Sequence, residues 1–191
     1  PNLRARLRRV IGRGLTQFGR LRVWIQGMLQ ESFESEKVAM THNSESVKVT
    51  SSLVTETIVT IDGPAASGKS SVSRELARRF GWSWVSTGSF YRGIAWAAGF
   101  SGLNLEDERA IVKLVESDRW EIRLTNEQTM FFFEGVDRTE DIGKESVGAM
   151  ASKISSYPLV RLALLQAQRD CAKGVTGLIA EGRDCGSVVF P

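Results

Sequence analysis

One eight-residue stretch, Gly63 to Ser70, constrains this chain more than any other. Its sequence, GPAASGKS, fits the pattern G-x-x-x-x-G-K-[ST]. The apolar run from Ile58 to Ile61 predicts a buried strand before it, and the apolar spacing from Ser70 to Phe80 predicts a helix after it. A glycine-rich turn between a strand and a helix aims successive backbone N–H groups at one point, so the stretch predicts a phosphate-binding loop.

The residue types in this loop suit the polyphosphate of a nucleoside triphosphate with its Mg²⁺ ion. Lys69 is expected to reach the β- and γ-phosphates, and the Ser70 hydroxyl is expected to ligate Mg²⁺. The expected ATP-binding residues are Gly63, Pro64, Ala65, Ala66, Ser67, Gly68, Lys69, Ser70 and Ser71. Motors, GTPases and small-molecule kinases share such a loop, so the motif alone leaves the reaction open.

Strand-like and helix-like segments alternate after this loop, which predicts an α/β fold with a parallel sheet flanked by helices. The β-like pair WEIRL and TMFFFEGV, near residues 120–136, interrupts the alternation and is expected to be an insert outside the central sheet. The segments expected to alternate are a strand at WSWV, helices at SFYRGIAWAAGF, LEDERAIVKLVES, KESVGAMASKISS and PLVRLALLQAQRDCAK, and a strand at GLIAEGRD.

The basic charge of the chain is concentrated at its N-terminal end. Residues 1–40 carry eight basic and three acidic side chains, a net of +5, whereas residues 41–191 carry 17 basic and 19 acidic ones, a net of −2. Residues 1–40 are predicted to form one or two basic helices. Their open interpretations are a mis-called start, with the true start at Met40 or Met28, a fused upstream domain, a targeting or membrane-surface helix, and a nucleic-acid-binding arm.

The composition of the chain argues against a zinc site and against a membrane-spanning protein. The two cysteines and one histidine lack zinc-ligand spacing, and no run of about 18 apolar residues suggests a membrane span. No nucleic-acid partner is expected for the core, and a cytoplasmic monomer is the expected state. The expected domains are an extension and linker over residues 1–52 and a core over 53–191, with an insert over 118–150.

Two further segments offer groups for a second, anionic ligand. In STGSFYRG, residues 86–93, a hydroxyl and an arginine fork flank a helix start; the alternative is a helix N-cap with Arg92 in solvent. In GLIAEGRD, Glu181 ends a buried strand and suits the carboxylate that organises Mg²⁺, with Arg183 and Asp184 in the following turn. The alternative there is a surface Arg–Asp pair worth about 0–1 kcal/mol.

These motifs together make the chain similar to the bacterial-type cytidylate kinases of the nucleoside monophosphate kinase family. The resemblance rests on IDGPAASGKSS, STGSFYR, SKISSYPLVRLALLQAQR and IAEGRDCGSVVFP, in the family's order over about residues 57–191. It implies phosphorylation of CMP or dCMP by ATP with Mg²⁺. It also implies that the insert near residues 120–145 is the family's CMP-binding subdomain.

The resemblance also implies particular residue roles. Thr87 and Arg92 would contact CMP, Ser152 would read the cytosine, and Arg161 would also contact the nucleotide. Arg183 would hold the CMP phosphate and Asp184 the sugar hydroxyls. The expected catalytic residues are Lys69, Arg92, Arg161 and Arg183, and the expected metal site is Ser70 with Glu181 through water.

Two departures from the family pattern qualify these roles. Ser86 stands where the family usually has aspartate, which puts that contact in doubt. Family members continue past the position of Pro191 with another strand and a basic lid, so a polypeptide of residues 1–191 is expected to be weak or inactive in catalysis. The alternatives are another small-molecule or UMP kinase, and a non-catalytic nucleotide-binding fragment with a basic arm that binds RNA or membrane.

Overall fold

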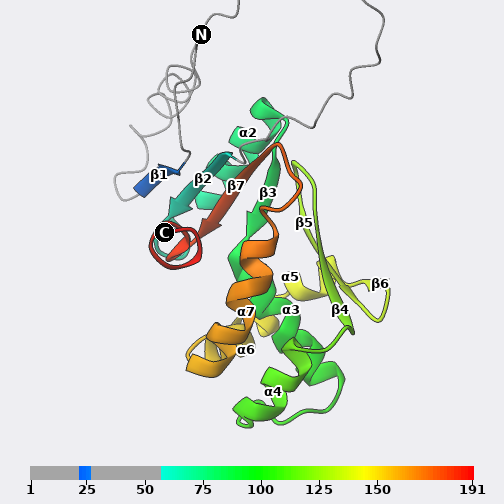
Figure 1. Cartoon of the computed structure of the whole chain (residues 1–191). Coiled ribbons are helices and arrows are strands. Elements are labelled where there is room, and N and C mark those ends of the chain that lie inside the picture. The colour runs from blue at the N-terminus through cyan, green and yellow to red at the C-terminus, as the bar shows by residue number, and fades with distance from the viewer. Residues whose placement is uncertain (1–21, 27–56) are drawn as a thin grey trace, which may run out of the picture.

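A computed structural model describes residues 22–26 and 57–191 (Figure 1). In chain order the elements are β1 (Arg22–Gln26), β2 (Thr57–Asp62), α2 (Lys69–Phe80), β3 (Ser83–Ser86), α3 (Thr87–Phe100), α4 (Glu108–Val115), β4 (Trp120–Leu124), β5 (Thr129–Phe133), β6 (Val136–Asp137), α5 (Thr139–Gly143), α6 (Glu145–Ile154), α7 (Pro158–Asp170), β7 (Gly177–Gly182) and the π-helical turn η2 (Cys185–Val189). None of the described helices has the length and apolar character needed to cross a bilayer.

The central sheet has the strand order β1-β2-β7-β3, and β7 runs parallel to both of its neighbours. Its residues alternate between two apolar layers: Leu178 and Ala180 pack into the cluster built largely on α3 and α7, while Ile179 packs into the cluster that contains Leu76 of α2. Both layers are fully buried at these positions. Burial on both faces explains the continuous apolar run of this strand and confirms the predicted α/β fold.

The helix prediction for the basic N-terminal segment is wrong at Arg22–Gln26. This stretch forms β1, which pairs antiparallel with β2. The pairing satisfies backbone N–H and C=O groups along an edge of β2 that β7 leaves open, which is a stronger constraint than local helix propensity. The rest of the predicted extension and linker lies outside the described residues.

The strands expected in the insert form a separate antiparallel sheet, with the order β4-β5-β6. It is nevertheless tied to the core, because the backbone N–H of Trp84 donates to the carbonyl of Thr125 at 2.9 Å and the N–H of Ser86 donates to Thr129 Oγ1 at 2.9 Å. Phe131 and Phe133 of β5 are buried in the same cluster as α3. The insert therefore extends the core against β3 and α3.

Two short elements were not expected from the sequence. α5 is only five residues long, too short to show an apolar period, and η2 follows the polar turn after β7. The helix α3 begins at Thr87, two residues before the predicted segment.

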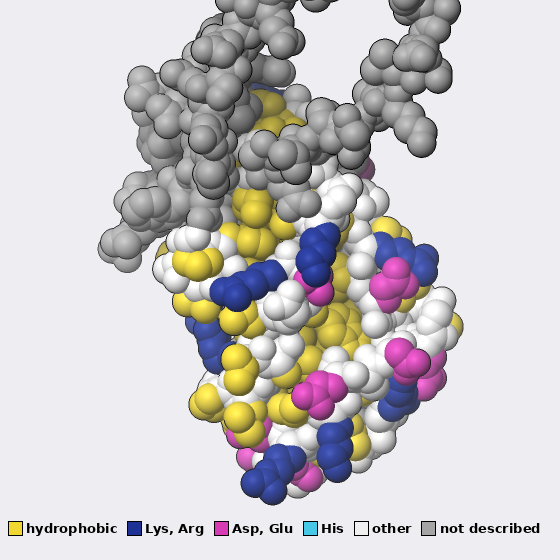
Figure 2. Space-filling model, viewed as in Figure 1, with side chains coloured by type: hydrophobic (Ala, Val, Ile, Leu, Met, Phe, Trp, Pro, Cys, Tyr) yellow, Lys and Arg dark blue, Asp and Glu magenta, His cyan; other side chains and the backbone are white. Residues whose placement is uncertain are grey.

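On the face shown in Figure 2, the described Lys and Arg side chains lie interspersed with Asp and Glu side chains, as on an ordinary solvated surface.

The contact between α3 and β5 is close enough to require glycine at residue 93. A Cβ atom built on Gly93 would overlap the ring of Phe131, coming within 2.8 Å of its Cγ, whereas a Cβ on Gly99 of the same helix meets only Met150 Sδ at 3.8 Å. We expect Gly93→Ala to lower the free energy of unfolding by about 1–3 kcal/mol through overpacking. Gly99→Ala is the matched control and should be neutral or stabilising by up to about 1 kcal/mol.

Urea unfolding of both variants measures this difference. Equal stability of the two variants would show that α3 and β5 are not packed at this distance.

Candidate active site

One cavity of about 610 Å³ opens at the carboxyl ends of β2, β3 and β7. It brings together groups from all four sequence motifs. The expected site residues that line it are Ala65, Lys69, Ser70, Thr87, Arg92, Ser152, Arg161, Glu181, Arg183 and Asp184. The other expected loop residues, Gly63, Pro64, Ala66, Ser67, Gly68 and Ser71, lie in or beside the loop but not in the lining of the cavity. The carboxyl edge of a parallel sheet is where ligands of open α/β folds bind.

The phosphate loop has the backbone shape that its sequence predicts. Gly68 has φ of +82° and lies directly before α2, so the loop delivers Lys69 to the first position of the helix. Ala66 also holds a left-handed conformation, with φ of +57°, which costs a non-glycine residue about 1–2 kcal/mol. The Lys69 ammonium donates to the carbonyl of Pro64 at 2.5 Å, so it lies folded over the loop.

Ser70 and Glu181 meet across the gap between α2 and β7. The Ser70 hydroxyl donates to Glu181 Oε1 at 2.8 Å, and the Glu181 side chain belongs to a residue only 4% exposed. Its other oxygen, Oε2, is buried without a hydrogen-bond partner. Among the described residues no three His, Cys, Asp or Glu side chains form a metal cluster. Mg²⁺ commonly takes one or two carboxylates together with substrate phosphates and water, so the hydroxyl and the unsatisfied carboxylate oxygen fit this ion.

Arg92 is held by the insert rather than free in solvent. Its Nε donates to the Ile142 carbonyl at 2.8 Å, and its Nη2 donates to the carbonyls of Gly143 and Lys144 at 2.9 and 3.0 Å. A guanidinium carries five N–H groups, so these bonds leave Nη1 for another acceptor. Nη1 lies only 2.7 Å from the place where a Cβ of Gly148 would stand. The lack of a side chain at Gly148 thus gives Arg92 its position at the cavity wall.

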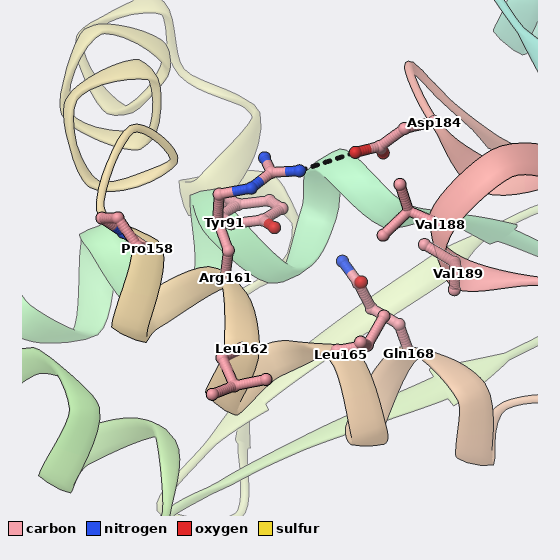
Figure 3. A pocket seen from close by; sticks show the side chains of 9 residues that line it. All are labelled: Tyr91, Pro158, Arg161, Leu162, Leu165, Gln168, Asp184, Val188 and Val189. Carbon is pink, nitrogen blue, oxygen red and sulfur yellow. Dashed lines mark hydrogen bonds and ion pairs between the residues drawn. The ribbon is translucent and has the colours of Figure 1, made fainter.

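Arg161 of α7 pairs with Asp184 of the turn after β7, as Figure 3 shows beside Tyr91. The distance between Arg161 Nη2 and Asp184 Oδ2 is 2.6 Å, and this carboxylate raises the pKa of the Arg161 guanidinium. Burial raises the pKa of Tyr91, which lies against the pair. Both charged side chains are more than 30% exposed, so the pair contributes at most about 1 kcal/mol to stability and leaves both groups free to rearrange around a ligand.

The remaining expected contacts differ in how tightly they are held. Arg183 is exposed and has no side-chain hydrogen bond or ion pair within the described part of the chain. Thr87 is 5% exposed; its hydroxyl donates to the carbonyl of Glu181 at 3.0 Å and lies 3.7 Å from Cys185 Sγ. Ser152 is exposed on α6. Ser86 lines the cavity as well, at the position where related proteins usually carry aspartate.

Sequence reasoning missed several groups at this site. Gly148, Ser155 and Ser156 line the cavity from α6 and the segment that follows it. Asp62 does not line the cavity but accepts hydrogen bonds from the turn after β7 that carries Arg183 and Asp184. A glycine within a helical pattern and serines near a helix end are common, so the sequence gives no distinctive signal for Gly148, Ser155 or Ser156. Asp62 could have been found, because it is an acidic residue directly before the phosphate loop.

The phosphate loop between β2 and α2, with a carboxylate at the tip of the adjacent parallel strand, places this chain in the P-loop kinase class of α/β proteins. The family model that matches it, over residues 59–191, is that of cytidylate kinase. The chain belongs to the cytidylate kinase family.

Individual relatives agree with this assignment. The chain is 58% identical over 134 residues to a cytidylate kinase of Bdellovibrio bacteriovorus, covering 70% of this chain and 62% of that protein. It is 41% identical over 136 residues to the cytidylate kinase of Stutzerimonas stutzeri, covering 70% and 59%, and 38% identical over 138 residues to that of Mycobacterium leprae, covering 72% and 60%. The chain therefore spans about six-tenths of the length of these curated relatives.

The two cysteines of the core are free thiols held in their neutral form. Burial raises the pKa of Cys171 to about 12, with Asp170 adding to the shift, and burial also raises the pKa of Cys185 well above its ordinary value. Only the thiolate reacts with disulfide reagents, so labelling at pH 8 should be at least about 100-fold slower in the folded chain than in urea.

Unfolding lowers both thiol pKa values. The free energy of unfolding should therefore be highest below about pH 9 and should decline as the pH rises above it.

Labelling with a chromogenic disulfide at pH 8, with and without urea, checks this expectation. Similar rates under the two conditions would contradict the burial of Cys185 and the partial burial of Cys171.

Proposed function

We propose that residues 57–191 form the nucleotide-binding core of an ATP-dependent kinase that phosphorylates CMP or dCMP to CDP or dCDP. The observation that carries the proposal is that a single cavity holds both a triphosphate site, with Lys69 and Ser70, and a cluster of basic groups opposite it, with Arg92, Arg161 and Arg183. A protein that only bound or hydrolysed ATP would not need this second set of cations. The names of the relatives support cytidine monophosphate as the acceptor.

The reaction requires positioning and charge neutralisation more than acid–base chemistry. An ionised phosphate oxygen of CMP attacks the γ-phosphorus of ATP, the bond from that phosphorus to the bridging oxygen breaks, and ADP leaves with the electron pair on its β-phosphate. The acceptor oxygen carries no proton at neutral pH, so no general base is needed. Lys69 would leave the Pro64 carbonyl for the phosphates, where it would stabilise the charge that develops on the transferred group.

Ser70 and Glu181 are the residues that would hold Mg²⁺, Ser70 through its hydroxyl and Glu181 through its unsatisfied oxygen and ordered water. The bound ion would supply positive charge that offsets the negative charge of the triphosphate. Glu181 already orients the Ser70 hydroxyl at 2.8 Å, so the two groups are pre-positioned for this role.

Each acceptor residue has a role that its local contacts support. Arg183, which has no competing ion pair within the described residues, would bind the CMP phosphate together with Nη1 of Arg92. The Thr87 hydroxyl donates its proton to the Glu181 carbonyl and faces Cys185 Sγ at 3.7 Å, so one of its lone pairs would accept from the nucleotide. Arg161 and Asp184 would open their mutual ion pair to contact the nucleotide, with Asp184 on the sugar hydroxyls, and Ser152 would contact the base.

The insert over residues 118–150 would serve as the CMP-binding subdomain. Its short helix α5 supplies two of the three carbonyls that hold Arg92, and α6, which begins within it, contributes Gly148 to the cavity wall. These contacts support the proposal that the insert belongs to the acceptor side of the site.

One variant on the triphosphate side of the cavity and one on the acceptor side test the proposal, the first through the rate of phosphoryl transfer and the second through CMP affinity. Lys69→Ala should lower the rate of phosphoryl transfer about 100- to 1000-fold with little change in CMP affinity, because it removes a transition-state donor. Arg183→Ala should weaken CMP binding by about 10- to 100-fold, equivalent to about 1.5–3 kcal/mol for a charged hydrogen bond, with ATP binding unchanged. Titration calorimetry on the 191-residue chain measures CMP and ATP binding. Radiolabelled product analysis measures the rate in a chain extended past Pro191 as in the longer family members.

Arg109→Ala is the matched control, since Arg109 is exposed on α4 and does not line the cavity. It should behave as the unaltered chain in both measurements. Calorimetry that shows UMP or AMP binding as tightly as CMP would overturn the choice of acceptor, and unchanged CMP binding by Arg183→Ala would overturn the assigned site.

The close approach of Arg92 to Gly148 gives a second test of the acceptor side. A methyl group in Gly148→Ala would collide with Arg92 Nη1. The flexible guanidinium would then move away from the three carbonyls of residues 142–144 that hold it, at little cost in stability. We expect CMP affinity to fall about tenfold, the loss of one charged hydrogen bond. Gly143→Ala, where a Cβ meets nothing within 4 Å, is the control. If both variants bind CMP equally well, Arg92 is not a CMP ligand.

A further inference from the structure

Asp62 connects the phosphate loop to the turn that carries Arg183 and Asp184. It is the last residue of β2, directly before Gly63, and is only 8% exposed. Its Oδ1 accepts the backbone N–H of Cys185 at 2.8 Å, and its Oδ2 accepts the backbone N–H of Gly186 at 2.9 Å. Both carboxylate oxygens are therefore used by two successive amides at the start of η2.

A reciprocal bond ties the other end of the same turn. The backbone N–H of Gly63 donates to the carbonyl of Gly182 at 3.2 Å. Arg183 and Asp184 consequently lie between two fixed points: Gly182, bonded to the first residue of the phosphate loop, and Cys185, bonded to the residue before that loop. The position of these two side chains is thus set relative to the loop itself.

The chemistry of the contact calls for a carboxylate. Two adjacent N–H groups need two acceptor oxygens, and an ionised carboxylate supplies both in charge-assisted bonds that are stronger than neutral ones. Asparagine has nearly the same shape but would aim its amide N–H₂ at one of the two backbone N–H groups. An unsatisfied donor in a buried place is destabilising, so the substitution should release one end of the turn.

We propose that Asp62 is a positioning residue that holds the acceptor-binding turn at a fixed place against the phosphate loop. The proposal rests on the function proposed above, because it assigns Arg183 and Asp184 to the acceptor nucleotide. Asp62 does not line the cavity, so it acts through the backbone of residues 182–186. Its loss should affect the acceptor side far more than the triphosphate side, where Lys69 and Ser70 keep their own helix.

The experiment compares Asp62→Asn with Val59→Ala in the 191-residue chain. Val59 is a fully buried core residue of the same strand, so its truncation lowers stability without altering the turn. Hydrogen exchange of individual amides, measured by NMR, reports on the two hydrogen bonds from Cys185 and Gly186 to Asp62. Calorimetry measures the dissociation constants for CMP and for ATP with Mg²⁺. In the unaltered chain the amides of Cys185 and Gly186 should be protected from exchange.

In Asp62→Asn we expect these two amides to exchange about 10- to 100-fold faster, the loss expected for a buried charged hydrogen bond. The CMP dissociation constant should rise about tenfold, while that for ATP changes less than about twofold. Val59→Ala should change CMP and ATP binding equally and leave these two amides no more affected than the rest of the sheet.

Unprotected Cys185 and Gly186 amides in the unaltered chain would overturn the proposal, even if Asp62→Asn failed to fold. Equal losses of CMP and ATP affinity in Asp62→Asn would also overturn it, since they would indicate a merely structural role. An unaltered chain that binds ATP but not CMP would instead overturn the proposed function, and the acceptor role of Asp62 with it. The exchange rates would still decide whether Asp62 holds the Cys185 and Gly186 amides.

Discussion

The site depends on the parallel register of β2 against β7. This register sets Ile61 opposite Glu181 and Asp62 opposite Gly182. It places the start of the phosphate loop beside the turn that ends β7, and it directs Glu181 toward Ser70. A shift of one residue would turn Glu181 to the other face of the sheet and separate the carboxylate from the loop. The apolar residues that fix this register, buried in layers on both faces, therefore fix the geometry of the site as well.

The order and kind of the main elements could be predicted from the sequence because each carries a local signal. The apolar run of Gly177–Gly182 indicates a strand buried on both faces, and the loop pattern specifies both its flanking strand and its helix. The strand Thr129–Phe133 was predictable too, because its β-branched and aromatic residues are typical of strands. The same local signals identified residues from four motifs that now line one cavity.

Other features depend on tertiary contacts and had no local signal. The strand at Arg22–Gln26 forms because β2 offers an unpaired edge, although its surroundings in the sequence suggest a helix. The carbonyl cage around Arg92 comes from residues about fifty positions further along the chain. The roles of Gly148 and Asp62 likewise exist only once α3 meets α6 and β2 meets β7. Such contacts explain why the residue types could be predicted but their hydrogen-bond partners could not.

The proposed phosphoryl transfer requires that ATP and CMP lie together in the one cavity, with their phosphates adjacent. A bisubstrate compound in which a pentaphosphate links the 5′ oxygens of adenosine and cytidine tests this most directly. Because one molecule would fill both halves, it should bind the 191-residue chain with 1:1 stoichiometry and at least about tenfold more tightly than ATP or CMP alone. Binding no tighter than that of ATP would contradict the account, since it would show that the second half of the cavity does not receive a cytidine nucleotide.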